Sequence, residues 1–497
     1  MFTPTDEQAE AADHFTAGHH LALQAGAGTG KTSTLALLAR STTRRGRYFA
    51  YNRAIAQEAA TRFPPNVTCR TAHSLAYAAL GHRYKRRLGA PRRPAWQTGQ
   101  DLGITKPVRA AGHTLMPTTL SNTVLRTVTR FCHSADTELA DHHIPQLRGL
   151  DSPAAHGELV GIVIPYARKA WADLQNPDTG AVRFDPDHFL KIWSLTNPTI
   201  HTDFLLLDEA QDTNPVLEHI FNNQRHHAQL VMVGDSAQAI YHWRGAKDVM
   251  TTFDGTHLAL SQSFRFGPAL AAEANRWLTL ADAPLRLTGS TTTSTTLGPL
   301  TRPDAILCRT NVGAMQQVMN HLDAGTRVAL VGGGDSLRAL ALAAQQLQQG
   351  RRTGHPELVL FPTWGAVQDY AAHDPSGRDL QPLVDLVDDH GTDAILNAVA
   401  RLSEEPHAEI TISTAHKAKG REWGRVKIAG DFLPPADTDE HDPHGQPIPG
   451  PVDSGEARLA YVAVTRARTC LDTGGLAWID LYPRDGTRPT SSVPSPA

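Results

Sequence analysis

The residues with the clearest chemistry form a glycine-rich run, QAGAGTGKT, from Gln24 to Thr32. The short apolar segment 21–24 precedes this run, and a helix-forming segment, 32–40, follows it. A strand, a tight turn and a helix in this order favour an anion, because backbone N–H groups and the helix N-terminus point into the turn. In this setting Lys31 reaches the β- and γ-phosphates of a nucleotide, and the Thr32 hydroxyl ligates Mg²⁺. The predicted nucleotide-binding residues are Gly26, Ala27, Gly28, Thr29, Gly30, Lys31, Thr32 and Ser33.

Two adjacent carboxylates, Asp208 and Glu209, follow a second apolar segment, residues 204–207. A strand that ends in two carboxylates suits Mg²⁺-dependent hydrolysis. Asp208 would hold the metal directly or through water, and Glu209 would polarise the attacking water. The alternative is a helix cap. The position of the pair downstream of a phosphate-binding loop favours the catalytic interpretation.

A third block of polar and aromatic residues follows the apolar segment 229–233. Gln238 comes soon after the predicted strand, where a sensor of the γ-phosphate would lie. Tyr241 and Trp243 are close to Arg244, a combination that stacks on a base and contacts its phosphate. The alternative for Trp243 is a place in the core.

In this order the three blocks resemble the superfamily 1 DNA helicases of the UvrD, PcrA and Rep group. Further segments resemble that family's remaining motifs, and the resemblance extends over residues 3–470. It implies that Gln8 reads adenine, Glu422 contacts the ribose, and Phe264 belongs to the nucleotide site. It also implies that Arg265 and Arg466 reach the γ-phosphate. The DNA contacts that it implies, together with the aromatic block, are Tyr51, Asn52, His73, Tyr241, Trp243, Arg244, Thr414 and His416.

Two segments, residues 52–56 and 416–420, also resemble the F-box DNA helicase branch, although no F-box is visible. Residues 421–423 read Arg-Glu-Trp where the family often has Leu-Glu-Phe, so we expect different local packing. Ala50 stands where an aromatic residue is often found, and Tyr51 is expected to supply the ring instead.

The alternation of strand and helix signals predicts an α/β protein with parallel sheets, and the resemblance implies two RecA-like P-loop lobes. We expect a helical insertion in the first lobe and a reduced insertion in the second. A basic run in the first insertion, between residues 83 and 93, is expected to contact DNA. The expected parts are a first lobe at 1–80 and 200–257, a helical insertion at 81–199, a second lobe at 258–350 and 408–486, a reduced insertion at 351–407, and a disordered tail at 487–497.

Composition is typical of a cytoplasmic globular protein. The 497 residues are 40% apolar and 20% charged, and the net charge is −3, so a polyanion must bind to local basic patches. No signal peptide or membrane-spanning run is visible, and the four cysteines form no CxxC pair. The adjacent histidine pairs His142–His143 and His226–His227 are interpreted as solvated surface rather than metal ligands.

The resemblance implies an ATP- and Mg²⁺-dependent DNA helicase or translocase. It would act on single-stranded DNA and on junctions of single and double strands, moving 3′ to 5′, in repair, replication or recombination. The short second insertion motivates an alternative, a DNA-stimulated ATPase that translocates or strips proteins with little unwinding. A third possibility is a nucleotide-gated DNA-binding scaffold. The presence of Lys31, Asp208, Glu209, Arg265 and Arg466 disfavours that scaffold.

Overall fold

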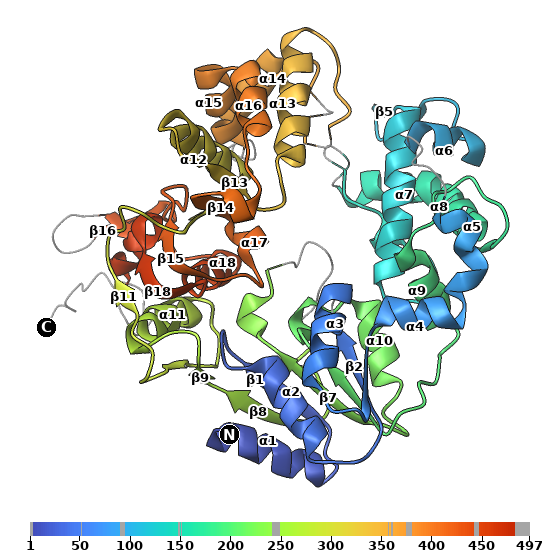
Figure 1. Ribbon diagram of the computed structural model, residues 1–497. Coiled ribbons are helices and arrows are strands. Elements are labelled where there is room, and N and C mark those ends of the chain that lie inside the picture. The colour runs from blue at the N-terminus through green and yellow to red at the C-terminus, as the bar shows by residue number, and fades with distance from the viewer. Residues whose placement is uncertain are drawn as a thin grey trace, which may run out of the picture. The chain divides into compact units, whose positions relative to one another are not determined.

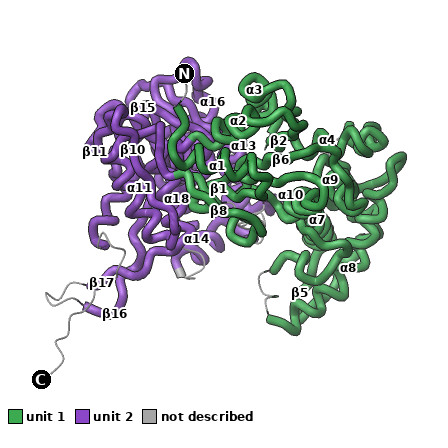
Figure 2. The backbone as a smooth tube through the Cα atoms, turned by 90° about the horizontal axis from the view of Figure 1, so that it is seen from below, with its two compact units in different colours: residues 1–25, 30–260 green, residues 26–29, 261–497 purple. Residues whose placement is uncertain are grey.

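The computed structural model describes residues 3–50, 52–89, 95–147, 150, 152–240, 249–355, 357–358, 361–373, 380–441 and 447–482. The chain divides into two compact units, residues 1–25 with 30–260 and residues 26–29 with 261–497 (Figure 2). Each unit contains a six-stranded parallel sheet with helices packed on it (Figure 1). The expected α/β class with two RecA-like lobes is therefore confirmed.

All neighbouring strands of the first sheet are parallel. Parallel strands end at one edge, so the segments that follow β1, β6 and β7 come together there. β8 pairs with β1 along its whole length, so the boundary expected between residues 257 and 258 falls inside a strand of the first sheet. In spatial order the strands are β3 (Val67–Thr71), β2 (Gly46–Ala50), β6 (Phe204–Leu207), β7 (Gln229–Gly234), β1 (Leu21–Ala25) and β8 (Thr256–Leu260).

The helical insertion shares a core with one face of this sheet. Leu205 and Met232 of the sheet belong to the same buried cluster as Val124 and Leu159 of the insertion. Phe204 belongs to a second cluster on the opposite face, as the alternation of side chains along a strand requires. The helices of the first unit are α1 (Asp6–Thr16), α2 (Lys31–Arg40), α3 (Arg53–Arg62), α4 (Ala72–Ala79), α5 (Lys85–Leu88), α6 (Ala95–Leu102), α7 (Pro117–His133), α8 (Pro153–Gln175), α9 (Pro186–Ser194) and α10 (Pro215–Asn222), with a hairpin of β4 (Val108–Ala110) and β5 (His113–Leu115).

The second unit repeats the parallel arrangement. Its main sheet consists, in spatial order, of β11 (Thr296–Leu297), β18 (Ala467–Asp472), β15 (Trp423–Ile428), β12 (Ala305–Cys308), β14 (Ile410–Thr414) and β13 (Val328–Leu330). Two small sheets pair β9 (Gln262–Ser263) with β10 (Thr288–Gly289), and β16 (Asp437–His441) with β17 (Pro447–Pro449). Its principal helices are α11 (Pro268–Leu280), α12 (Asn311–Asp323), α13 (Asp335–Gln348), α17 (Ala415–Ala418) and α18 (Ser454–Val464).

The segment 351–407 contributes three short helices among its described residues. They are α14 (Trp364–His373), α15 (Gln381–His390) and α16 (Thr392–Ala400). Their apolar side chains join those of α12 and α13 in one buried cluster, so these helices extend the core of the second unit. In the described part of the chain, no helix combines the length and the apolar character that a bilayer crossing requires.

One arginine of the basic run is part of the interior. Arg87 is 5% exposed and forms an ion pair with Asp173, with a distance of 2.8 Å between Nη2 and Oδ1. Its guanidinium also donates to the carbonyls of Asp173, Asn176 and Val182. A Cβ on Gly180 would lie 2.1 Å from Nη2, so a glycine is needed for this close approach. The expectation that the run 83–93 contacts DNA is therefore wrong for Arg87, because its hydrogen-bonding groups are turned inward.

We expect Arg87→Leu to lower the free energy of unfolding by about 3–5 kcal/mol, because Asp173 and three carbonyls would lose their buried partner. Arg86→Leu is the matched control, since Arg86 is exposed on the same short helix and should change stability by at most about 0.5 kcal/mol. Thermal unfolding monitored by circular dichroism measures both. Equal midpoints for the two variants would contradict a structural role for Arg87.

Candidate nucleotide site and strand-end residues

The phosphate-binding loop joins the buried strand β1 to the first turn of α2. Gly28 and Gly30 have φ angles of +77° and +78°, a left-handed conformation that glycine adopts without steric cost. Gly30 is the N-cap of α2 and supplies no side-chain acceptor. The N-terminus of α2 therefore keeps the N–H groups and the partial positive charge that bind an anion.

Asp208 lies at the end of β6, 6% exposed, with hydroxyl donors on two sides. The Thr32 hydroxyl donates to Oδ2 at 2.7 Å, and the Tyr48 hydroxyl donates to the same oxygen at 2.8 Å. Burial, together with the charge of Glu209, raises the pKa of Asp208, while Thr32, Lys31 and Tyr48 act against this rise. Tyr48 was not predicted as a site residue, because its contact depends on the pairing of β2 with β6.

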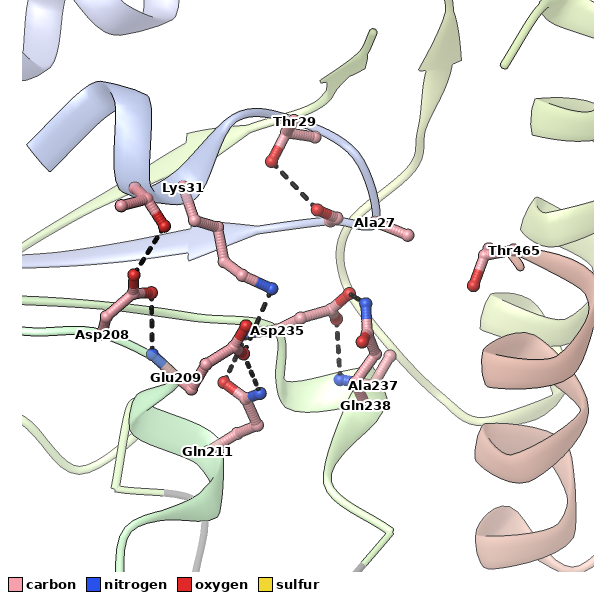
Figure 3. A network of polar contacts seen from close by, with 12 residues as sticks. Ala27, Thr29, Lys31, Asp208, Glu209, Gln211, Asp235, Ala237, Gln238 and Thr465 are labelled. Carbon is pink, nitrogen blue, oxygen red and sulfur yellow. Dashed lines mark hydrogen bonds and ion pairs between the residues drawn. The ribbon is translucent and has the colours of Figure 1, made fainter. Parts of the chain in front are cut away.

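Lys31 and Glu209 form an ion pair beside this carboxylate (Figure 3), with 3.3 Å between Nζ and Oε2. Burial lowers the pKa of Lys31, but Glu209, Asp235 and Asp208 outweigh burial and raise it. Glu209 has a φ angle of +52°, which is uncommon for a residue with a side chain and typical of functional sites. The turn after β6 therefore directs Glu209 toward the ammonium of Lys31.

Two further buried residues connect Glu209 to the end of β7. The Gln211 side chain donates to Glu209 Oε2 at 2.6 Å and accepts from the backbone N–H of Asp235 at 2.9 Å. The Asp235 carboxylate accepts from the Gln238 amide at 2.7 Å (Figure 3). Gln238 therefore lies at the predicted edge of the sheet, with its amide oriented by Asp235. The sequence signal for Asp235 was its place directly after the apolar segment of β7, and that for Gln211 was its place in the turn that follows β6.

The oxygens of Thr32 and Asp208 fit a small divalent cation. Mg²⁺ prefers oxygen ligands, and these two side chains bring a hydroxyl and a carboxylate together at the end of the phosphate loop. Mg²⁺ would neutralise charge on the phosphates of a bound nucleotide.

Gln8 is buried in α1, where its amide already has two protein partners. Its oxygen accepts from the Thr5 N–H at 3.2 Å, within a capping box, and its nitrogen donates to Thr34 at 3.0 Å. These contacts fix Gln8 against α2, the helix of the phosphate loop. Adenine recognition by Gln8 stays a prediction, as does a role for Ser33, which is exposed.

The predicted arginines of the second unit lie in different environments. Arg265 pairs with Glu422, with 2.7 Å between Nε and Oε2, and donates to the Thr465 carbonyl at 3.1 Å. Arg466 is 1% exposed, and its guanidinium donates to the Val462 and Arg421 carbonyls and to the Thr465 hydroxyl. Phe264 is 44% exposed, as a residue that stacks on a base would be. Contact of Arg466 with a phosphate would require its side chain to leave these partners.

Several predicted DNA contacts are helix caps at the ends of strands. The Asn52 side chain accepts from the Ile55 N–H at the start of α3, and Thr414 accepts from the Lys417 N–H at the start of α17. Asn52 is exposed, whereas Thr414 is buried. His416 follows in the first turn of α17, and burial lowers its pKa, with a further contribution from Arg309. The roles of these residues toward DNA stay predictions.

His73 is held by a residue that sequence patterns did not indicate. Asp187 at the start of α9 contacts His73 Nε2 through Oδ1 at 2.8 Å and His133 Nε2 through Oδ2 at 2.9 Å. Burial raises the pKa of Asp187, but the bonds from His133 and His73 outweigh it and place that pKa well below its usual range. Asp187 therefore links α4, which carries a predicted DNA contact, to two helices of the insertion.

Comparison with known proteins agrees with this geometry. The chain matches the family described as AAA domain over residues 8–244 and the UvrD-like helicase C-terminal domain over residues 375–472. The chain belongs to the UvrD-like superfamily 1 helicases.

Two relatives of this chain belong to the F-box branch. F-box DNA helicase protein 1 of Schizosaccharomyces pombe is 29% identical over 493 residues, which cover 91% of this chain and 55% of that protein. F-box DNA helicase 1 of Gallus gallus is 29% identical over 516 residues, covering 94% and 48%. UvrD2 of Mycobacterium tuberculosis, an ATP-dependent DNA helicase, is 25% identical over 336 residues, covering 55% and 47%. The chain therefore spans about half the length of these curated relatives.

Four of the residues predicted to bind DNA lie outside the described residues. They are Tyr51, Tyr241, Trp243 and Arg244. Their predicted contacts stay predictions.

One adjacent histidine pair of the chain converges on a carboxylate. His142 and His143 approach Asp136 Oδ2 with their Nε2 atoms at 2.7 and 2.9 Å. The three ligand atoms lie within 4.8 Å of one another, and His143 is 2% exposed. The interpretation as solvated surface is therefore wrong for His143, because the short helical turn 141–143 directs its ring inward toward Phe131.

We expect Asp208→Asn to raise the thermal midpoint of the nucleotide-free protein at pH 8. A carboxyl group whose pKa is raised in the folded state disfavours folding above its unfolded pKa of about 3.9. Removing its charge therefore increases the stability of the fold most at high pH. The gain should shrink as the pH falls, because Asp208 with its raised pKa then takes up its proton.

Differential scanning fluorimetry from pH 5 to 8 measures this gain. Asp254→Asn is the control, since the Asp254 side chain is 93% exposed. A lower midpoint for Asp208→Asn at every pH would mean that the hydroxyl bonds to Asp208 outweigh its burial.

Proposed function

We propose that this chain is an ATP-dependent DNA helicase or translocase that moves along single-stranded DNA, in the 3′ to 5′ direction, in repair, replication or recombination. The observation that carries the proposal is the cluster of Lys31, Thr32, Asp208 and Glu209 at the end of the phosphate loop, in a member of a helicase family. Lys31 would bind the β- and γ-phosphates. Thr32 and Asp208 would hold Mg²⁺, and Glu209 would polarise the attacking water.

The proposal assigns the remaining residues on the basis of the family motifs. Gln8 and Phe264 would bind the base, Glu422 the ribose, and Gln238 would sense the γ-phosphate. Arg265 and Arg466 would stabilise charge on the transferring phosphoryl group, so hydrolysis depends on residues of both units. The proposed DNA contacts, on single strands and at junctions with duplex, are Tyr51, Asn52, His73, Tyr241, Trp243, Arg244, Thr414 and His416.

A second candidate function is a DNA-stimulated ATPase that strips proteins from DNA with little unwinding. The small segment between α13 and β14, with three short helices among its described residues, favours it. A forked duplex and a streptavidin-blocked single strand, tested side by side with ATP, distinguish the two. Streptavidin release without strand separation would support the second candidate.

Lys31→Ala tests the ATPase assignment. We expect ATP turnover on saturating single-stranded DNA to fall by about 10²-fold or more, because one preorganised contact to developing phosphate charge is worth about 3–4 kcal/mol. Lys106→Ala, at an exposed residue, is the control. A turnover within about tenfold of the parent, in a variant whose circular dichroism is unchanged, would count against the proposal.

Arg265 and Arg466 should act as one unit on hydrolysis. Removing either should lower single-turnover hydrolysis by about 10²-fold or more, with little loss of ATP binding, because their charge matters most in the transition state. Removing both arginines should lower the hydrolysis rate by a smaller factor than the product of the two single factors. The measurement is single-turnover hydrolysis by Arg265→Gln, Arg466→Gln and the double variant, all saturated with DNA.

Arg468→Gln is the matched control, since Arg468 approaches Glu422 at 3.7 Å on the same unit. Multiplicative losses in the double variant would mean that the two arginines act separately. A normal rate for either single variant would remove that arginine from the site.

A further inference from the structure

Three arginine side chains line one groove at the edge of the first sheet, apart from the nucleotide site. The groove has a volume of about 890 Å³, and residues of α3, α4 and β3 form much of its lining. Arg47 lies on β2, Arg53 on α3 and Arg70 on β3, which is the outermost strand of the sheet. We call this feature the arginine groove.

The arginine groove carries unbalanced positive charge. No aspartate or glutamate lines it, and the three guanidinium groups make no hydrogen bond or ion pair with other described residues. Several arginines elsewhere in the described chain are paired, as Arg309 is with Glu456 at 2.6 Å. Like charges gathered in a concave surface attract a polyanion, because the surrounding protein focuses their field.

One wall of the groove is aromatic. Tyr77 is 37% exposed, and its ring centroid lies 5.9 Å from that of Phe189, at an angle of 64°. His73, a proposed DNA contact, lines the same groove. Phe189 is 3% exposed, so Tyr77 is the ring of this pair that is open to a base. Cationic side chains beside an exposed ring suit single-stranded nucleic acid, whose phosphates bind arginine and whose bases stack on aromatic rings. An acidic peptide that adds a strand to β3 would satisfy the charges but would not need the rings.

We propose that the arginine groove is a binding surface for single-stranded DNA that extends the proposed DNA track from His73 to the outer strand β3. Arg47 and Arg70 bind phosphates there, and Tyr77 stacks on a base. A volume of about 890 Å³ leaves room for a few nucleotides. The inference rests on the proposed function, since it extends that function's DNA contacts to residues outside the family motifs.

The test is the salt dependence of binding to fluorescein-labelled oligo-dT of 8 to 30 nucleotides, measured by anisotropy. For single strands each lost phosphate contact reduces the slope of log K against log salt by about 0.7. Arg47→Gln and Arg70→Gln should each show this reduced slope. Since 0.1 M salt is tenfold below 1 M, a slope difference of about 0.7 makes each variant bind about fivefold more weakly than the parent at 0.1 M salt. Arg45→Gln is the matched control, because Arg45 is exposed just before β2 and does not line the groove.

Tyr77→Leu tests base stacking separately from the electrostatic contacts. It should weaken binding without changing the salt slope, because stacking releases no counterions. In one outcome the parent binds oligo-dT, and His73→Ala binds it more weakly, while the Arg47 and Arg70 variants match Arg45→Gln in affinity and salt slope. That result would overturn the proposed role of the arginine groove and leave the proposed function intact. Arginine-dependent binding of polyglutamate, with oligo-dT binding unaffected, would assign the groove to a protein partner instead. Failure of the parent to bind oligo-dT would overturn the proposed function itself.

Discussion

A carboxylate buried at the end of β6 constrains the edge of the first sheet. Removing a charge from water costs several kcal/mol unless donors replace the lost hydration. For Asp208 these donors are the hydroxyls of Thr32 and Tyr48, which come from α2 and β2. β2 must therefore pair with β6 in one register, with Tyr48 opposite Leu206, so that its phenol reaches the turn that follows. The same register fixes the start of α3, which follows β2 directly.

Capping distinguishes the helix of the phosphate loop from three other helices that follow parallel strands. Side chains of Asn52, Thr71 and Thr414 accept N–H bonds at the starts of α3, α4 and α17. Gly30 supplies no such bond at the start of α2. A side-chain cap satisfies a backbone donor that an external anion would otherwise bind. Among these four helices, α2 alone therefore keeps its first turn fully available to a phosphate, although all four follow parallel strands.

Local patterns predict the parts of the site that lie within one strand and its following turn. Lys31, Asp208 and Gln238 each follow an apolar segment, and parallel strands bring such positions to one edge. Tyr48 bonds to Asp208 and Asp187 bonds to His73, partners more than 100 residues away, so no short pattern contains these contacts. Basic residues in a run are usually solvated, and the burial of Arg87 depends on Gly180 and the turn around it. The start of the second unit was placed too early because β8 alternates between half-buried and exposed residues, as edge strands of either sheet do.

The helical insertion is tied to the sheet by its core and by its charges. Val124 and Leu159 share one apolar cluster with the strands, so the insertion cannot separate from the sheet without exposing that surface. Asp187 adds a polar link, because one carboxylate is shared between His73 on α4 and His133 on α7. Pro186 and Phe189 of the same helix line the arginine groove. A shift of α9 would therefore move the ring of His73 and the aromatic wall of the groove together, so any DNA bound along this face would contact the insertion and the sheet as one surface.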